Sequence, residues 1–237
     1  MLFYYIRHGD PIYSPDSLTE HGKVQAEALS EMLCNSGFDK IFVSTSKRAR
    51  QTAEPTCQKT GIEPVLLDFA NEHYAWISLV MDKEDGTGEE WLFQEKRSMA
   101  LFCTREIRDL GDRWFDHPFF AGRGYEEAIE RVYREADAFM ESLGYVHDRY
   151  TGKYRAVAPN DDRVALFAHQ GFGLAFLSCL LDIPYPAFST HFDMCHTGVT
   201  VIDFSADENG MCIPKILTLS NDSHLYCKGI PSNYPKF

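Results

Sequence analysis

Short apolar runs alternate with stretches of helical periodicity along much of the chain. Continuous runs of apolar and β-branched residues are typical of strands that are covered on both faces of a sheet. We expect six strands, several of which are such runs, at residues 2–6, 40–43, 64–67, 164–168, 198–204 and 214–219.

The segments between these runs predict helices at residues 19–35, at 46–60 and after Gly171. Thr19 is a suitable N-cap for the first helix, and Gly37 lies just beyond its end. Strands that alternate with helices indicate an α/β fold, here a three-layer α/β/α sandwich with a mainly parallel central sheet.

Residues 73–161 break this alternation. Their periodicity predicts two longer amphipathic helices, at 91–110 and 125–143, with loops at 111–114 and 144–160. We therefore expect a single domain, residues 1–237, in which 73–161 form an inserted helical cap region beside the sheet.

Composition is that of an ordinary globular protein, with 44% hydrophobic and 24% charged residues. The net charge of −12 argues against a nucleic-acid partner, because phosphate backbones are bound mainly by an excess of Lys and Arg. The sequence shows no export signal and no apolar run of about 18 residues, so no membrane partner is expected. The seven cysteines are scattered, which predicts reduced thiols in a cytoplasmic protein. The oligomeric state is left open.

Three predicted strands end in residues suited to phosphate chemistry. Arg7-His8-Gly9 follows the first strand, Arg48 lies in the helix that follows the second, and His169-Gln170 follows the fourth. The carboxyl ends of parallel strands form the usual ligand-binding edge of an open α/β sheet. A neutral imidazole is a competent nucleophile, and guanidinium groups bind phosphate oxygens well. The sequence therefore predicts that these side chains meet in an anion site.

These motifs resemble those of the histidine phosphatase superfamily, also called phosphoglycerate mutase-like. The resemblance rests on residues 7–9, 18–26, 44–53, 164–171 and 221–225, in the order in which the family has them. It implies a phosphohistidine on His8 and a phosphate pocket of Arg7, Arg48 and His169. In this family a carboxylic acid after the third strand protonates the leaving group, a role that would fall to Glu72, with Asp68 as the alternative.

The resemblance implies a cofactor-independent phosphomonoester hydrolase of the histidine acid-type, without a metal. We expect Gly9, Asp10 and Gln170 to contribute to substrate binding. The chain departs from the family pattern at Asp10-Pro11 and at Gln170, and residues 10–14 do not resemble the mutase branch. A phosphoglycerate mutase-type phosphotransferase and a non-catalytic phospho-ligand binding protein remain alternatives. The expected substrate is a phosphorylated small molecule or a phosphoprotein.

Two further groups have simpler interpretations. His191, Asp193, Cys195 and His196 fit no metal-ligand spacing and predict a loop near the pocket. The tryptophans of the inserted region more often serve packing than substrate binding, and both interpretations stay open for Trp76, Trp91 and Trp114.

Overall fold

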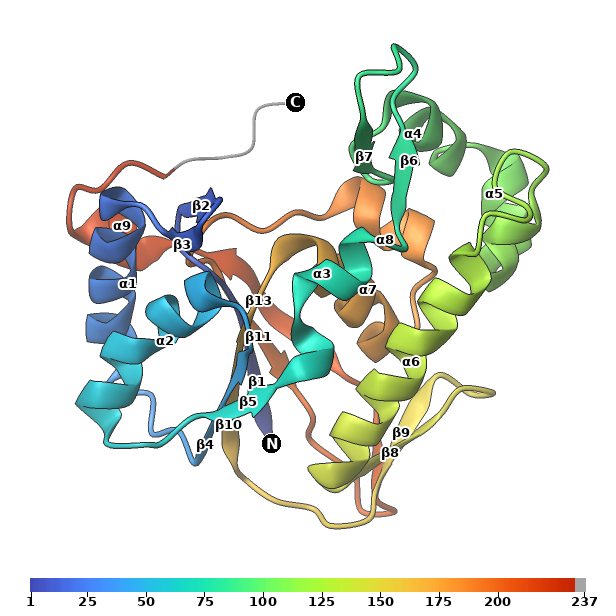
Figure 1. Cartoon of the computed structure of the whole chain (residues 1–237). Helices are drawn as coiled ribbons and strands as arrows, with labels where there is room; N and C mark the ends of the chain where they lie inside the picture. Colours follow the sequence, from blue (N-terminus) through green and yellow to red (C-terminus); the bar gives the residue numbers. More distant parts are fainter. Residues whose placement is uncertain (233–237) are drawn as a thin grey trace.

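A computed structural model describes residues 1–232 and contains a central six-stranded sheet in the order β13-β11-β1-β10-β4-β5 (Figure 1). Strands β1, β10, β4 and β5 pair in parallel, and β11 and β13 are added antiparallel. The sheet is therefore mainly parallel, and each predicted strand forms part of it. The strands are β1 Leu2–Arg7, β4 Lys40–Ser44, β5 Val65–Leu67, β10 Arg163–Ala168, β11 Val199–Asp203 and β13 Lys215–Asn221.

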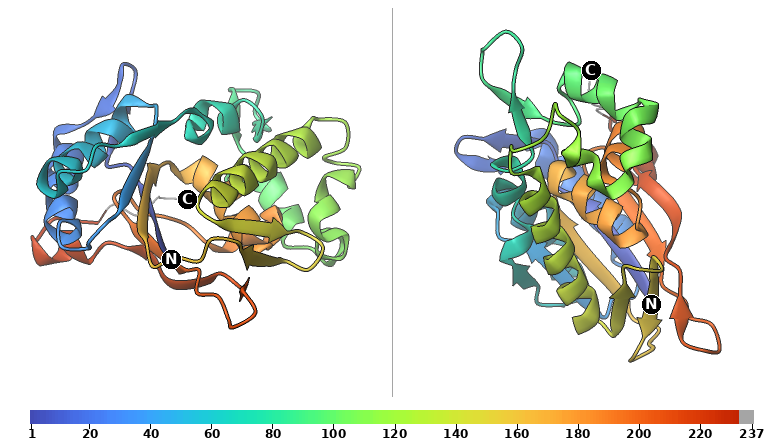
Figure 2. Two further views of the ribbon diagram at one scale, coloured as in Figure 1. Left: turned by 90° about the horizontal axis from the view of Figure 1, so that it is seen from below. Right: turned by 90° about the vertical axis from the view of Figure 1, so that its right-hand side faces the viewer.

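Helices cover both faces of this sheet (Figures 1 and 2). Helices α1 (Glu20–Leu33), α2 (Lys47–Thr60) and α9 (Ser223–Cys227) lie on one side, and α6 (Tyr125–Ser142) and α7 (Gln170–Leu181) on the other. Strand β10 shows why both faces must be covered. Alternate residues, such as Leu166 and Phe167, belong to two separate apolar cores.

Local capping sets the helix ends close to the predicted positions. The Thr19 hydroxyl accepts a hydrogen bond from Gly22 N at 2.9 Å, which begins α1. The Ser46 hydroxyl does the same for Ala49 N at 3.3 Å in α2, and Gly61 with φ 74° ends that helix. Helix α1 thus begins one residue after its predicted start and ends two residues early.

The region after β5 differs from the prediction. The single helix expected at 91–110 is wrong, because the chain forms β7 (Glu89–Trp91), then α4 (Lys96–Phe102) and α5 (Arg105–Leu110). The Thr104 hydroxyl accepts from Ile107 N at 3.3 Å and begins a new helix inside the periodic stretch. Strand β7 pairs with β6 (Val80–Asp82) as a hairpin, shown in green at the top of Figure 1.

The loop expected at 144–160 contains a second hairpin, β8 (Tyr145–Asp148) and β9 (Lys153–Ala156), which pairs with β12 (Met211–Cys212). Four-residue strands alternate too briefly to be distinguished from a loop by sequence. The helix expected at 125–143 is confirmed as α6. The remaining elements are the hairpin β2 (Pro11–Tyr13) and β3 (Asp16–Leu18), the 3-10 helices Asp68–Ala70 and Gly111–Asp116, α3 (Glu72–Trp76) and α8 (Tyr185–His191).

One of the three tryptophans is a core residue. Trp114 is fully buried and makes edge contacts with Phe102 and Phe120. Its role is therefore packing, whereas Trp76 and Trp91 are only partly buried. Within residues 1–232, no helix is both long enough and apolar enough to cross a membrane.

Candidate active site

The carboxyl ends of the parallel strands bring the predicted residues together. Arg7 ends β1 and pairs with Ala168, the last residue of β10. His8 N donates to the Ala168 carbonyl at 3.0 Å, so His8 and His169 follow adjacent strands. Their ring centroids are 5.1 Å apart, and both rings are buried. The predicted convergence of the two imidazoles is thus found in the structure.

The hydrogen bonds of His8 distinguish its two ring nitrogens. Nδ1 lies 2.7 Å from the carbonyl oxygen of Gly9, which can only accept, so Nδ1 carries the proton. Nε2 then has a free lone pair, and Arg48 Nε donates to it at 3.3 Å. The ring is therefore held with an unprotonated nitrogen facing a guanidinium group.

Arg48 connects His8 to two carboxylates. Its Nη2 donates to Glu72 Oε2 at 2.9 Å and its Nη1 to Asp16 Oδ1 at 2.8 Å. Glu72 Oε1 also accepts from Gly171 N at 2.8 Å, at the beginning of α7. Glu72 begins α3, directly after β5 and its short 3-10 turn. Of the two candidate acids, Glu72 lies at this site, whereas Asp68 bonds to Thr45 and Tyr74.

His169 is held by hydroxyl groups from β4 and the segment after it. Its Nε2 lies 2.8 Å from Ser44 Oγ and 3.2 Å from Ser46 Oγ. Hydroxyl donation to Nε2 leaves the ring proton on Nδ1, and this atom has no hydrogen-bond partner among residues 1–232. Glu72 Oε2 lies 3.6 Å from Nδ1.

Arg7 is held by a residue that sequence reasoning did not assign to the site. Its Nη1 donates to the Met194 carbonyl, and its Nη2 lies 3.1 Å from His196 Nε2. The His196 ring is also 5.8 Å from that of His8. His196 comes from the loop before β11, where the sequence predicted proximity to the pocket but no role. Arg7 Nε is buried without a partner in the described part of the chain.

The three residues expected to bind substrate have distinct positions. A side chain on Gly9 would lie 2.8 Å from the Gly22 carbonyl, so the turn after β1 requires glycine. Asp10 accepts from the Thr19 hydroxyl at 2.7 Å, and its Oδ1 is 3.6 Å from His196 Nδ1. Gln170 donates to Asp193. Gly9 and Asp10 thus shape the rim of the site, and Gln170 ties α7 to the loop before β11.

Burial and charge keep the imidazoles neutral. Burial first, and then His169, Arg7 and Arg48, hold the pKa of His8 well below its ordinary value. Burial and the same two arginines lower the pKa of His169. Burial would lower the pKa of Arg48, but Glu72 and Asp16 outweigh it and raise that pKa. An uncharged imidazole beside a firmly charged guanidinium suits nucleophilic attack on an anion.

The side chains of His8, Glu72 and His169 also offer three ligand atoms within 4.8 Å of one another. This donor set is of a kind that holds transition metals. Arg48, however, lies within hydrogen-bond distance of both His8 and Glu72, so its positive charge opposes a cation at this position. The surroundings therefore fit an anion better than a metal ion.

A cavity of about 810 Å³ opens beside Arg48 and Glu72. Trp76 and Trp91 form part of its wall, so two of the three tryptophans do line a pocket. The other lining residues are Tyr13, Asp16, Thr45, Ser46, Lys47, Asn71, His73 and Gln94.

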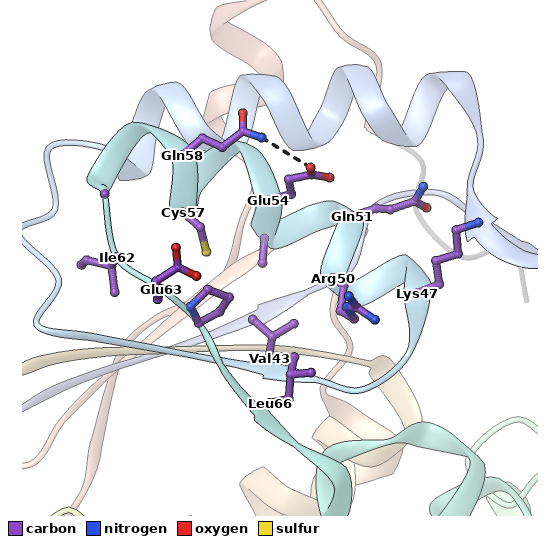
Figure 3. Close-up of a pocket in the computed structure, with 13 residues that line it drawn as sticks. Val43, Lys47, Arg50, Gln51, Glu54, Cys57, Gln58, Ile62, Glu63 and Leu66 are labelled. Carbon is purple, nitrogen blue, oxygen red and sulfur yellow. Dashed lines mark hydrogen bonds between the residues drawn. The ribbon is translucent and has the colours of Figure 1, made fainter.

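A second cavity, of about 820 Å³, lies between α2 and the edge strand β5 (Figure 3). Cys57, Glu63 and Leu66 are among its lining residues, and Gln58 donates to Glu54 along its upper side. None of the residues predicted to act on phosphate lines it. The cavity beside Arg48 is therefore the one that belongs to the candidate active site.

Comparison with known proteins shows which family the chain resembles. Residues 3–100 match the model of the histidine phosphatase superfamily, branch 1. An adenosylcobalamin/alpha-ribazole phosphatase of Salmonella typhi is 25% identical over 193 residues, which cover 78% of this chain and 81% of the relative.

Two solved structures share the fold. The phosphate complex of a mycobacterial glucosyl-3-phosphoglycerate phosphatase superposes with a TM-score of 0.60 at 19% identity, over 94% of this chain and 98% of the other. A phosphoserine phosphatase from Entamoeba histolytica, in complex with 3-phosphoglyceric acid, gives a TM-score of 0.57 at 18% identity, with 94% and 98% covered. The N-terminal part of the chain, residues 3–100, thus matches the histidine phosphatase superfamily, and the fold of the whole chain is similar to that of phosphatases of known structure.

Proposed function

We propose that the protein is a cofactor-independent phosphomonoester hydrolase that acts through a phosphohistidine on His8. The observation that carries this proposal is the state of the His8 ring. Its Nδ1 is tied to the Gly9 carbonyl, and its Nε2 lone pair faces Arg48. In this tautomer Nε2 has the lone pair that attacks phosphorus. The adjacent guanidinium can neutralise the negative charge of the phosphate oxygens.

The surrounding donors suit a tetrahedral anion. Arg7 Nε and His169 Nδ1 are buried without partners among residues 1–232, and an unsatisfied buried donor is costly. Phosphate oxygens would accept from both. Arg48 Nε would turn from His8 to a third oxygen as the substrate enters, which frees Nε2 for attack.

The reaction then has two balanced halves. His8 Nε2 bonds to phosphorus and the ester P–O bond breaks. Glu72 takes up a proton from the monoanionic phosphate ester and delivers it to the departing alkoxide. Water next attacks the phosphohistidine, Glu72 takes a proton from it, and the P–N bond breaks to release inorganic phosphate. In this scheme Arg7, Arg48 and His169 bind the transferred group, and Gly9, Asp10 and Gln170 shape the site around it.

We also infer an acid-type pH optimum. The lowered pKa of His8 keeps the nucleophile neutral below pH 6.5, where a free imidazole would be protonated. The cavity of about 810 Å³ fits a phosphorylated small molecule, which we assign as the substrate.

The test is phosphate release from an aryl phosphate in EDTA, with acid-labile phosphoenzyme trapped during turnover. We expect His8→Asn to abolish both signals. His191→Asn, at the exposed end of α8, is the matched control and should retain both. Turnover that persists in His8→Asn would refute the nucleophile. If wild type hydrolysed no member of a substrate panel that includes bisphosphoglycerate, the alternative of a non-catalytic binding protein would remain. Transfer of the phosphoryl group to an alcohol instead of water would favour the mutase-type alternative.

A further inference from the structure

The proposed reaction fixes the direction in which the alcohol part of a substrate must leave the phosphate. His8 attacks phosphorus from one side, and the departing oxygen has to reach Glu72 on the other. Glu72 and Arg48 line the cavity of about 810 Å³. The body of the alcohol therefore occupies this cavity, and its walls determine which alcohols fit.

Trp76 is placed in this wall by the same short helix that carries Glu72. The two residues are four positions apart in α3, so they lie on one face of it. Both line the cavity, and Trp76 is only partly buried. A group bonded to an oxygen at Glu72 would meet the Trp76 indole next.

Trp91 reaches the same place from a different segment. It ends β7 in the hairpin of the inserted region and contacts Trp76 edge to face, with ring centroids 5.0 Å apart. Its six-membered ring occupies the space that a Cβ on Gly171 would need. Gly171 N is the donor to Glu72 Oε1, so this indole is seated directly beside the bonded carboxylate.

The rest of the wall is polar around this aromatic corner. Asn71, His73, Gln94 and Lys47 line the cavity together with Tyr13, which lies under the Arg48 guanidinium at 5.4 Å. Each water accounts for about 30 Å³, and a three-carbon alcohol is only as large as a few waters. Such an alcohol would therefore leave most of the cavity of about 810 Å³ to water. Two neighbouring indoles instead provide flat, apolar contact for a ring.

We propose that the substrates are phosphomonoesters whose alcohol carries a flat aromatic or heteroaromatic ring close to the phosphorylated carbon. The inference rests on the proposed function, which places the leaving oxygen at Glu72. Trp76 and Trp91 are the side chains expected to contact the ring of the alcohol. Small phosphorylated acids and short alkyl phosphates would be poor substrates, since they reach neither indole.

The first experiment compares kcat/KM for 2-(2-naphthyl)ethyl phosphate and propyl phosphate, whose alcohols have similar acidity. We expect the naphthyl ester to be preferred by at least about tenfold, the scale of a good aromatic contact. The corresponding non-hydrolysable phosphonates are compared in parallel by calorimetry. This arm reports on the ring pocket without requiring turnover.

Trp76→Leu should reduce the naphthyl-to-propyl ratio to about one third or less in both arms. Trp91→Leu is the second variant, with folding of both checked by circular dichroism. Tyr150→Ala removes a ring that is 97% exposed in the turn between β8 and β9, and serves as the control that keeps the ratio.

The outcomes separate the two proposals. Equal kcat/KM and equal phosphonate affinity in wild type, with phosphoenzyme formed, would overturn the ring specificity and leave the hydrolase standing. A preference that survives in both tryptophan variants would also overturn it. Tighter binding of the naphthyl phosphonate without any turnover or phosphoenzyme would instead support the ring pocket and refute the proposed hydrolysis.

Discussion

Glu72 divides its two carboxylate oxygens between a cation and a backbone amide. Oε2 accepts from Arg48 and Oε1 from Gly171 N, and the side chain is buried. The carboxylate is thus fixed in one orientation, which suits the proton transfers proposed for it. This placement depends on two helices that are distant in the sequence, because α7 begins 94 positions after the end of α3.

Glu72→Gln should lower kcat/KM for an alkyl phosphate by about 10² or more, because its alkoxide cannot leave without a proton. The loss should be much smaller for 4-nitrophenyl phosphate, whose leaving group departs unprotonated. Steady-state kinetics on both substrates test this, with Glu54→Gln on the exposed face of α2 as the control. An equal loss for both substrates would show that Glu72 is structural.

The buried His196 side chain should make the folded protein less stable at low pH. Burial, followed by the nearby Arg7, lowers its pKa to about 3. The unfolded chain, with an ordinary histidine pKa, therefore binds more protons between about pH 6.5 and 3. Stability consequently falls as the pH drops through this window.

We expect wild type to lose stability between pH 7 and pH 5, and His196→Asn to lose about 2 kcal/mol less over the same interval. Urea unfolding at the two pH values measures this difference. His21→Asn is the control, since the His21 ring is not among the buried residues of the site. An unchanged pH dependence in His196→Asn would show that the folded protein accepts a proton at this position.

At the scale of elements, the turn after β1 links a helix cap to the site. The Thr19 hydroxyl accepts from Gly22 N and donates to Asp10, whose other oxygen faces His196. Thr104 caps α5 in a similar way but lies in the segment between β5 and β10. The two threonines therefore allow the capping effect to be separated from the effect on the site.

Thr19→Ala and Thr104→Ala should each reduce the free energy of unfolding by about 1 kcal/mol. Only Thr19→Ala should also lower kcat/KM, because Asp10 loses the contact that orients it. Denaturant unfolding and steady-state kinetics on the same preparations test the pair. A comparable kinetic loss in Thr104→Ala would mean that general destabilisation, not Asp10, is responsible.

At the scale of the whole molecule, the proposed function requires a protein of net charge −12 to bind an anion beside Arg7 and Arg48. Arg7 and Arg48 are both buried, and a bound phosphate would relieve donors left unsatisfied in the described structure. A ligand that binds only the folded state stabilises it by mass action. Binding to the site should therefore appear as added stability despite the unfavourable overall charge.

Inorganic phosphate at one hundred times its dissociation constant should raise the unfolding free energy by about 2.7 kcal/mol. The comparison is made against chloride at equal ionic strength, so that general screening is excluded. Arg48→Gln should abolish most of the gain, whereas Arg50→Gln, an exposed position on the same helix, should keep it. If only Arg50→Gln removed the stabilisation by phosphate, the anion would bind on the exposed face of α2 and not at the proposed site.

The sequence by itself determined the six strands of the central sheet, the helices α1, α2, α6 and α7, and the strand-end residues of the site. Continuous apolar runs such as 164–168 need cover on both faces, and caps such as Thr19 and Ser46 are local signals. His8, Arg48 and His169 could be placed together because carboxyl ends of parallel strands share one edge. The strands and helix caps depend on residues that are neighbours in the sequence, and the meeting of the site residues follows from the geometry of parallel sheets.

Only the tertiary structure decided the rest. The pairing of Arg7 with His196, and the seating of Trp91 against Gly171, join segments far apart in sequence, and no local pattern encodes such distances. The break at Thr104 and the hairpins of residues 80–91 and 145–156 were likewise missed. Their strands are only three or four residues long, so their pairing is stabilised by contacts with the rest of the fold rather than by a periodicity of their own.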